Sequence, residues 1–248
     1  AIVRDLEEVV LPGVTHWQSP GWFAYFPANT TVPSILAALA SAGLGQQGML
    51  WATSPACTEI EMAMMNWLVA LWVLPTRWRW PGPGGGLLQM TASDATHLAL
   101  VVARNRGRAA GASIEAMVVY ASDQAHSSLE KGARIAGFEH VRALPTDESY
   151  ALRPEALSTQ LEADRAQGLL PVFVNSTVGT TGTTAIDPVR AIGEIARAEG
   201  LWHHVDAAYA GTAMMCPELQ PLQDGLELCD SYVFNPHKWM GVGFDCSC

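Results

Sequence analysis

Lys238 stands in the stretch VFNPHKWMG (233–241), directly after an apolar run that is typical of a buried strand. A lysine in such a place loses hydration unless its amine is paired or takes part in covalent chemistry. Asp206 lies in a similar place, because it follows the strand-like residues of LWHHVDAAY (201–209). A buried carboxylate requires a cationic partner or a metal ion. The two residues therefore indicate a site that combines a reactive amine with a charged partner.

Two further stretches carry polar residues at a predicted junction of strand and helix. In QMTASDAT (89–96), Thr91 and Ser93 bring a hydroxyl and free backbone N–H groups together. That geometry suits a phosphate, and an ordinary helix N-cap is the simpler interpretation of it. In SDQAHSS (122–128), His126 opens a helix. A lone histidine is more often structural than catalytic, so His126 by itself does not indicate a catalytic site.

A metal site is not predicted. His203 and His204 are neighbours in the same predicted strand as Asp206. Successive side chains of a strand point to opposite faces, so the two histidines cannot chelate one ion together.

The elements that position these residues alternate along the chain from residue 87 onward. The strand-like stretches are LLQM, AMVVYAS, LPVFVNST, LWHHVDAAY and SYVFN, and the helix-like ones are SDATHLALVVARNR, SSLEKGARIAG and DPVRAIGEIARAEG. This alternation predicts an α/β fold around a mostly parallel sheet. Ligands of such sheets bind at the carboxyl ends of the strands. Lys238, Asp206, His126 and Ser93 are all expected at those ends.

The first part of the chain has a different pattern. Residues 1–76 are predicted to be mostly helical, and Thr58 and Glu61 resemble a capping box at the start of a helix that Pro75 stops. The loop RWRWPGPGGG (77–86) is the best candidate for a boundary. We therefore expect a helical N-terminal segment over 1–76 and a large α/β domain over 77–248.

Composition narrows the class of protein. Of 248 residues, 49% are hydrophobic and 15% are charged, so the chain can bury a substantial core. The net charge of −10 argues against a nucleic-acid binder. Five cysteines without a CxxC pair suggest reduced thiols and a cytoplasmic location. The apolar run MAMMNWLVALWVL (62–74) is shorter than the roughly 18 residues of a membrane span, so no membrane association is expected.

Together, the strand-end residues match the requirements of pyridoxal 5'-phosphate. A lysine forms a Schiff base with its aldehyde, and a helix N-terminus takes its phosphate. An aspartate keeps its pyridine nitrogen protonated, so that the ring withdraws electrons. The residues therefore predict Lys238 as the Schiff-base lysine.

Longer stretches resemble a known family. These are GVTHWQSPGWFAYFP, WATSPACTEIEMAMMNWL, GGGLLQMTASDAT, YASDQAHSSLEKG, STVGTTGTTAIDPV, HVDAAYAGTAMMCPE and FNPHKWMGVGFDCS, in this order. They resemble the group II pyridoxal-phosphate decarboxylases, and among these the aromatic-L-amino-acid decarboxylases. The resemblance implies the aspartate-aminotransferase-like fold (PLP fold type I) and a homodimer that shares its active sites. It also implies decarboxylation of an aromatic L-amino acid to the amine and CO2.

The resemblance assigns roles residue by residue. It makes Lys238 the Schiff-base lysine, Asp206 the partner of the pyridine nitrogen, and His126 the residue that stacks on the ring and positions the substrate carboxylate. Further cofactor contacts are implied for Ala92, Ser93, Thr181, Ala208, Asn235 and His237. The substrate-pocket wall is implied for Trp17, Tyr25, Phe26 and Pro27. Part of that wall is expected across the dimer interface, around Gln47 and Met49.

Departures from the family pattern leave alternatives open. The chain is expected to begin inside the family's N-terminal segment and to lack its C-terminal small domain, together with a loop tyrosine that protonates Cα. One expectation is a separate C-terminal polypeptide, and the other is a catalytically incomplete cofactor-binding fragment. An aldehyde synthase of the same family is a third alternative, because that tyrosine distinguishes the two reactions. His126 favours decarboxylation, since some aldehyde-forming members replace it.

Overall fold

A parallel sheet organises the larger part of the molecule. The computed structural model describes residues 1–26 and 28–248. The strands are β1 (Met117–Ser122), β2 (His140–Leu144), β3 (Leu170–Thr177), β4 (Trp202–Asp206) and β5 (Ser231–Val233). They form one sheet in the order β2-β1-β3-β4-β5, and every neighbouring pair is parallel. The predicted α/β fold with a mostly parallel sheet is confirmed.

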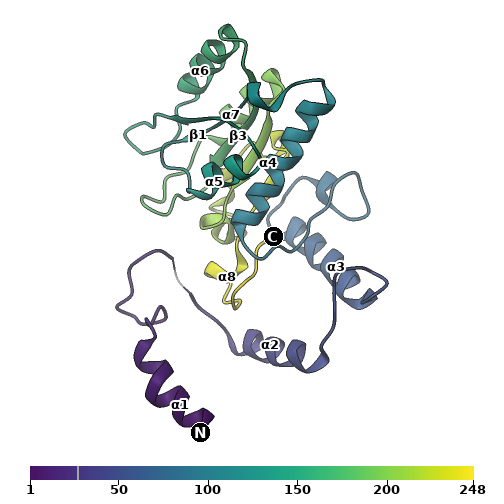
Figure 1. Cartoon of the computed structure of the whole chain (residues 1–248), viewed down its shortest axis with the longest axis vertical. Coiled ribbons are helices and arrows are strands. Elements are labelled where there is room, and N and C mark those ends of the chain that lie inside the picture. The colour runs from purple at the N-terminus through teal and green to yellow at the C-terminus, as the bar shows by residue number, and fades with distance from the viewer. Residues whose placement is uncertain (27) are drawn as a thin grey trace.

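Helices cover both faces of this sheet (Figure 1). One face carries α4 (Ala92–Ala109) and α5 (Ser128–Ile135), and the other carries α6 (Pro154–Ala166) and α7 (Val189–Glu199). The side chains of β1 alternate between the two layers, because Val119 packs with α4 and α5 while Tyr120 packs with α6 and α7. Both residues are fully buried. Burial on both faces explains why the strands are continuous apolar runs in the sequence.

The N-terminal segment is helical, as predicted. It contains α1 (Ile2–Asp5), a π-helical turn (Leu6–Val10), a 3-10 turn (Leu11–Gly13), α2 (Val32–Leu44) and α3 (Pro55–Leu71). Helix α3 is anchored to the sheet domain, since Met65 and Leu68 are buried in the same core cluster as Val205 of β4. Helices α1 and α2 bury none of their residues and lie apart from the sheet (Figure 1).

Short elements complete the chain. These are α8 (Pro236–Trp239) and 3-10 turns at Thr76–Trp78, Ile114–Ala116, Ala210–Met215, Gln220–Gln223 and Leu226–Leu228. Among the described residues, no helix is long and apolar enough to cross a membrane.

Two local predictions are wrong. The stretch LLQM (87–90) is not a strand, because only Gln89 pairs, in an isolated antiparallel bridge with Ser247. The capping box is also absent, since α3 begins at Pro55 and the Glu61 carboxylate instead accepts a hydrogen bond from the Leu88 N–H at 2.7 Å. Strand β2 and helix α6 lie in parts of the chain for which no element was predicted.

The two histidines of β4 are buried on opposite sides of the strand. His203 Nε2 lies 2.7 Å from Ser176 Oγ, whereas His204 Nδ1 lies 2.8 Å from Ser231 Oγ. Burial lowers the pKa of His203 to about 4 and the pKa of His204 to about 3. Both rings are therefore neutral in the folded protein near pH 7. Within residues 1–26 and 28–248, no three His, Cys, Asp or Glu side chains are grouped as metal ligands.

We predict that His204 makes folding sensitive to acid. Its folded pKa lies below the unfolded value of 6.5, so its contribution to stability is present above pH 6.5 and is lost as the pH falls toward 3. The free energy of unfolding should fall by about 1.4 kcal/mol per pH unit below 6.5 from this residue alone. In urea titrations from pH 7 to 4.5, His204→Gln should flatten this dependence. His16→Gln, at an exposed position, should retain the wild-type slope, and an equal slope for all three proteins would contradict the account.

Candidate active site

A cavity of about 470 Å³ opens where the strands of the sheet end. Most of its lining comes from the ends of β3 and β4, from the segments after β1, β3, β4 and β5 and from the start of α4. Every residue predicted to bind a cofactor contributes to it: Ala92, Ser93, His126, Thr181, Asp206, Ala208, Asn235, His237 and Lys238. The parallel sheet therefore brings together residues that are up to 146 positions apart in the sequence, from Ala92 to Lys238.

The N-terminus of α4 lies at the cavity. Thr91 is the N-cap, and its hydroxyl accepts a hydrogen bond from the Asp94 N–H at 3.1 Å. The following residues, Ala92 and Ser93, line the cavity from the first turn of the helix. The first N–H groups of a helix lack partners within it, and the helix dipole makes this end positive. This end of the cavity is suited to an anion.

Asp206 is the last residue of β4 and is held in place by its neighbours. It pairs in register with Thr177 of β3 and with Val233 of β5. Its side chain is 8% exposed, and Oδ1 accepts a hydrogen bond from the Ala208 N–H at 3.0 Å. The carboxylate is thus fixed at the cavity, where it is suited to a cationic group.

Lys238 lies in the short helix α8, one turn after the N-cap Asn235. It is only 9% exposed, and its Nζ lies 4.5 Å from the centre of the Phe26 ring. Burial lowers the pKa of Lys238, and the charge of Asp206 partly opposes that effect. None of the ion pairs among the described residues includes Lys238. A buried amine with a lowered pKa is more easily deprotonated, and the deprotonated form is the nucleophile.

Two histidines face the same cavity in fixed orientations. His126 is exposed, and its Nδ1 accepts a hydrogen bond from the Ser128 N–H at 3.2 Å, so that Nε2 is the free nitrogen. His237 is 5% exposed, and its Nδ1 accepts from the Cys246 N–H at 3.0 Å. Burial is the main cause that lowers the pKa of His237. Neutral His237 therefore carries its proton on Nε2, where it can donate.

The predicted substrate-wall residues are only partly brought to this cavity. Phe26 lines it, whereas Trp17 lines a neighbouring cavity of about 590 Å³ that shares Phe244 with the first. Tyr25 is 69% exposed and stacks on Trp17 at a centroid distance of 5.4 Å. Pro27 lies outside the described residues. The aromatic residues thus form a continuous group beside the cavity, with Phe26 nearest to Lys238.

Several lining residues were not singled out in the sequence. Besides Thr177, Gly179 and Thr180, they include Gln124, Tyr209, Phe244 and Asp245. Most are polar or aromatic residues within a few positions of a strand end, so the strand-end rule would have found Gln124 and Tyr209. Phe244 and Asp245 follow the loop after α8, and their place depends on how that loop returns to the sheet.

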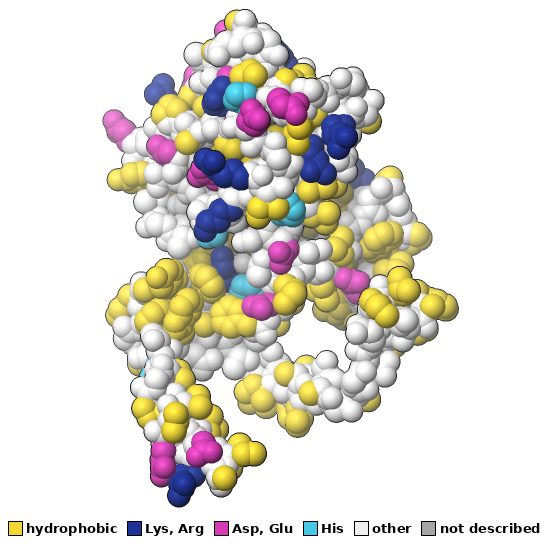
Figure 2. All heavy atoms as spheres, in the orientation of Figure 1, with side chains coloured by type: hydrophobic (Ala, Val, Ile, Leu, Met, Phe, Trp, Pro, Cys, Tyr) yellow, Lys and Arg dark blue, Asp and Glu magenta, His cyan; other side chains and the backbone are white. Residues whose placement is uncertain are grey.

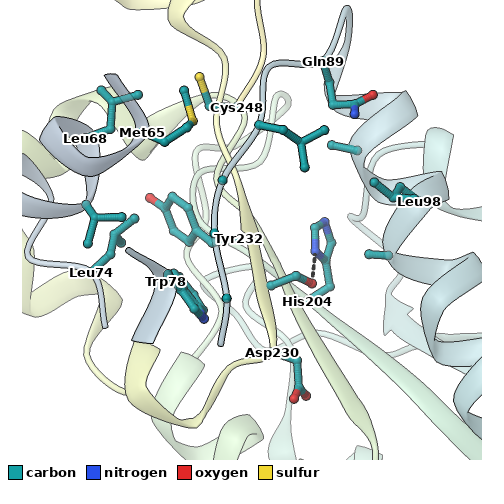
Figure 3. Close-up of a pocket in the computed structure, with 18 of the residues that line it drawn as sticks. Met65, Leu68, Leu74, Trp78, Gln89, Leu98, His204, Asp230, Tyr232 and Cys248 are labelled. Atoms are coloured by element: carbon teal, nitrogen blue, oxygen red, sulfur yellow. Dashed lines mark hydrogen bonds between the residues drawn. The ribbon is translucent and has the colours of Figure 1, made fainter. Parts of the chain in front are cut away.

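A second cavity, of about 520 Å³, is lined by residues of α3, α4, β4 and β5 and is mostly apolar. Figure 3 shows Met65, Leu68 and Trp78 on one wall and Leu98 on the other, with His204 between them. His204 Nδ1 already forms a hydrogen bond with the Ser231 hydroxyl, and Figure 3 draws this bond as a dashed line. None of the residues predicted to act on a cofactor or substrate lines this cavity, whereas all of the predicted cofactor residues line the cavity at the strand ends.

Comparison with known proteins identifies the family. A family model described as the pyridoxal-dependent decarboxylase conserved domain matches residues 1–248. The chain belongs to this family. Phenylacetaldehyde synthase of Arabidopsis thaliana is 48% identical over 99% of this chain and 51% of its own length. Aromatic-L-amino-acid decarboxylase of Bos taurus is 48% identical over 100% of this chain and 53% of its own length.

A solved structure of a decarboxylase has the same fold as this chain. Catharanthus roseus tryptophan decarboxylase, solved in complex with L-tryptophan, superposes with a TM-score of 0.96 at 40% identity. The match covers 100% of this chain and 54% of that one. The chain therefore spans about half the length of the relatives that it matches.

Proposed function

We propose that this chain forms the cofactor-binding part of a pyridoxal-phosphate-dependent enzyme that decarboxylates an aromatic L-amino acid to its amine and CO2. The observation that carries the proposal is the arrangement around Lys238. A buried amine with a lowered pKa, a buried carboxylate and a helix N-terminus line one cavity at the ends of parallel strands. The family assignment supports the same chemistry.

The lining residues fit each part of the cofactor. The phosphate fits the N-terminus of α4, where Ala92 and Ser93 offer N–H groups and a hydroxyl, with Asn235 and His237 nearby. Neutral His237 carries a proton on Nε2 that can be donated to a phosphate oxygen. Thr181 and Ala208 line the space between the strand ends and complete the wall that faces the ring.

Lys238 attaches the cofactor, and Asp206 maintains the protonated pyridine ring. Lys238 attaches the cofactor aldehyde covalently, and its lowered pKa makes the nucleophilic free amine easier to form. Asp206 stabilises a proton on the pyridine nitrogen through a charge-assisted hydrogen bond. When bound, pyridoxal phosphate withdraws electrons from the Cα of an attached amino acid. Asp206 is held by the Ala208 N–H, so it can keep that nitrogen protonated without moving.

His126 and Phe26 orient the substrate. The ring of His126 is fixed through Nδ1 by the Ser128 N–H and can stack on a planar ligand, leaving Nε2 free to bind the substrate carboxylate. Phe26 provides an apolar wall next to Lys238, and Trp17 packs against it edge to face at 5.9 Å. Apart from Lys238, no lysine or arginine among the described residues lines either of these two cavities. An aromatic side chain is therefore favoured over an acidic one.

A second reaction of the same site is aldehyde formation. It is supported by the similarity to phenylacetaldehyde synthase, which equals the similarity to the decarboxylase. Aldehyde formation would consume dioxygen and water and release ammonia and hydrogen peroxide along with CO2. The cofactor site would be the same, and product analysis distinguishes the two reactions.

We predict that Lys238 holds the cofactor covalently. After incubation with pyridoxal phosphate and reduction with borohydride, peptide mapping should find the pyridoxyl group on Lys238. Lys238→Ala should lose the adduct and at least about a thousandfold of turnover, or ~4 kcal/mol in the barrier. Lys131→Ala removes the other lysine, at an exposed position, and should retain both. A reducible adduct of undiminished yield in Lys238→Ala would refute the assignment.

The substrate preference follows from the wall residues. We expect the enzyme to prefer L-tryptophan, L-phenylalanine, L-tyrosine or L-DOPA over L-glutamate by at least about a hundredfold in kcat/KM, or ~3 kcal/mol. An aromatic ring buries apolar area against the wall, whereas a carboxylate would be desolvated without a partner. Competition assays that measure CO2, amine and aldehyde test this. Equal rates with glutamate would contradict the aromatic preference and leave the cofactor assignment standing.

We also propose that the chain assembles as a homodimer through its N-terminal segment. Helix α1, the π-helical turn Leu6–Val10 that follows it and helix α2 expose large apolar residues, including Ile2 (85%), Val9 (70%) and Leu39 (69%). Figure 2 shows hydrophobic side chains along both helices. An exposed apolar surface of this kind is typical of an interface.

Light scattering should give twice the subunit mass for the wild type. Leu39→Glu should shift the protein toward the monomer, because the interface would bury a charge. Ser41→Glu, a matched change at another exposed position of α2, should have the smaller effect. A monomeric wild type at micromolar concentration would contradict this proposal.

A further inference from the structure

Asp187 is a buried carboxylate outside the catalytic assignments. It is 1% exposed, and Oδ2 accepts a hydrogen bond from the Thr177 N–H at 2.7 Å. Oδ1 accepts from the Leu152 N–H, also at 2.7 Å. The Asp187 N–H in turn donates to the Thr177 carbonyl at 2.9 Å. Three hydrogen bonds thus join this residue to the end of β3 and to the loop before α6.

These hydrogen bonds close the base of a loop that lines the cavity. Residues 178–186 leave β3 after Thr177 and return at Asp187, and Val178 and Ile186 form a bridge between the two limbs. The N–H groups of Gly179 and Thr180 both donate to the Ala185 carbonyl at 3.0 Å. Residues 179–182 of this loop line the cavity. The loop is internally hydrogen-bonded, so its position depends on how its base is held.

The same base is joined to Asp206. Thr177 pairs with Asp206 in register, and the Val178 N–H donates to the Asp206 carbonyl at 2.8 Å. A shift of Thr177 would therefore move both the loop and the strand end that carries Asp206. Leu152, the other partner of Asp187, is 1% exposed and belongs to the core beneath β1 and β3. Asp187 consequently ties the cavity wall to a rigid part of the molecule.

Both oxygens of the carboxylate are needed for this role. The two backbone N–H groups approach different oxygens, and an ionised carboxylate accepts from both. Burial raises the pKa of Asp187 to about 6, against the lowering effect of the two N–H groups, so the ionised form predominates at pH 7. An asparagine in this place would turn its NH2 group toward one of the donors. One hydrogen bond would then be lost and two donors would face each other.

We propose that Asp187 is a positioning residue for the cofactor site: its carboxylate holds the 178–186 loop and the end of β3, and thereby Thr181 and Asp206, in their places. The inference rests on the proposed function, since it assigns a role toward the same cofactor. Asp187 itself does not line the cavity. It acts through the backbone of its neighbours.

Asp187→Asn tests this, with Asp164→Asn as the matched control. Asp164 is an equally buried carboxylate that accepts from Tyr120 Oη and from Arg142, and it does not line the cavity. Both variants should lower the unfolding temperature of the protein without cofactor. Only Asp187→Asn should weaken pyridoxal phosphate binding, by at least about tenfold in the dissociation constant, or ~1.4 kcal/mol. It alone should also change the visible circular dichroism of the bound cofactor.

Hydrogen exchange provides a readout that needs no cofactor. Amides of the 178–186 loop should exchange faster in Asp187→Asn than in the wild type or in Asp164→Asn. Asp187→Glu keeps both acceptor oxygens and should lie between the wild type and Asp187→Asn in loop exchange and in affinity. It also serves as the test variant if the asparagine variant does not fold.

The experiments distinguish failure of the inference about Asp187 from failure of the proposed function. Unchanged loop exchange in Asp187→Asn, or an equal loss of cofactor affinity in Asp164→Asn, would overturn the inference. If wild-type protein bound no pyridoxal phosphate, the proposed function would fail, and loop exchange would still decide whether Asp187 holds the loop.

Discussion

The parallel pairing of β3, β4 and β5 is the constraint on which the rest of the structure depends. It places Thr177, Asp206 and Val233 in one row across the sheet. Because parallel strands run in one direction, the residues that follow each strand meet at the same edge. Asn235 and Lys238 arrive there after β5, and His126 arrives after β1. Helix α4 packs on the sheet through Leu100 and Ala103, which brings its N-terminus to the same place. A site of distant residues is thus built from backbone pairing and a helix start.

Buried polar groups are stabilised in different ways in different parts of the molecule. Asp164, which does not line the cavity, is paired with Arg142 at 2.7 Å and with the Tyr120 hydroxyl. His203 and His204 are kept neutral. Lys238 is buried and forms no ion pair among the described residues, although its Nζ lies over the Phe26 ring, and Asp206 only partly offsets the effect of burial on its pKa. An unpaired buried amine is unfavourable for folding. The burial of Lys238 at the cavity is consistent with the proposal that a bound group uses its amine.

The sequence predicted the α/β sheet and the residues at its strand ends because the patterns that indicate them are local. Apolar runs alternating with amphipathic helices indicated β1, β3, β4 and β5, and strand-end logic led to Asp206 and Lys238. Strand β2 was missed because HVRAL mixes charged and apolar residues at the edge of the sheet. LLQM resembled a strand by composition but forms a single bridge, through Gln89. Asp187 escaped notice because its partners, Thr177 and Leu152, are backbone groups that only the folded chain brings together. Likewise, no local pattern indicated that Trp17 and Tyr25 lie beside the cavity while Phe26 lines it.

A crystal structure of the protein grown with pyridoxal phosphate tests the central claim most directly. The account predicts continuous density from Lys238 Nζ to the cofactor and the pyridine nitrogen within hydrogen-bond distance of Asp206. It also predicts the phosphate at the N-terminus of α4, against Ala92 and Ser93. Cofactor density in the apolar cavity near Trp78 and Leu98, or in the strand-end cavity with the phosphate turned away from α4, would contradict it.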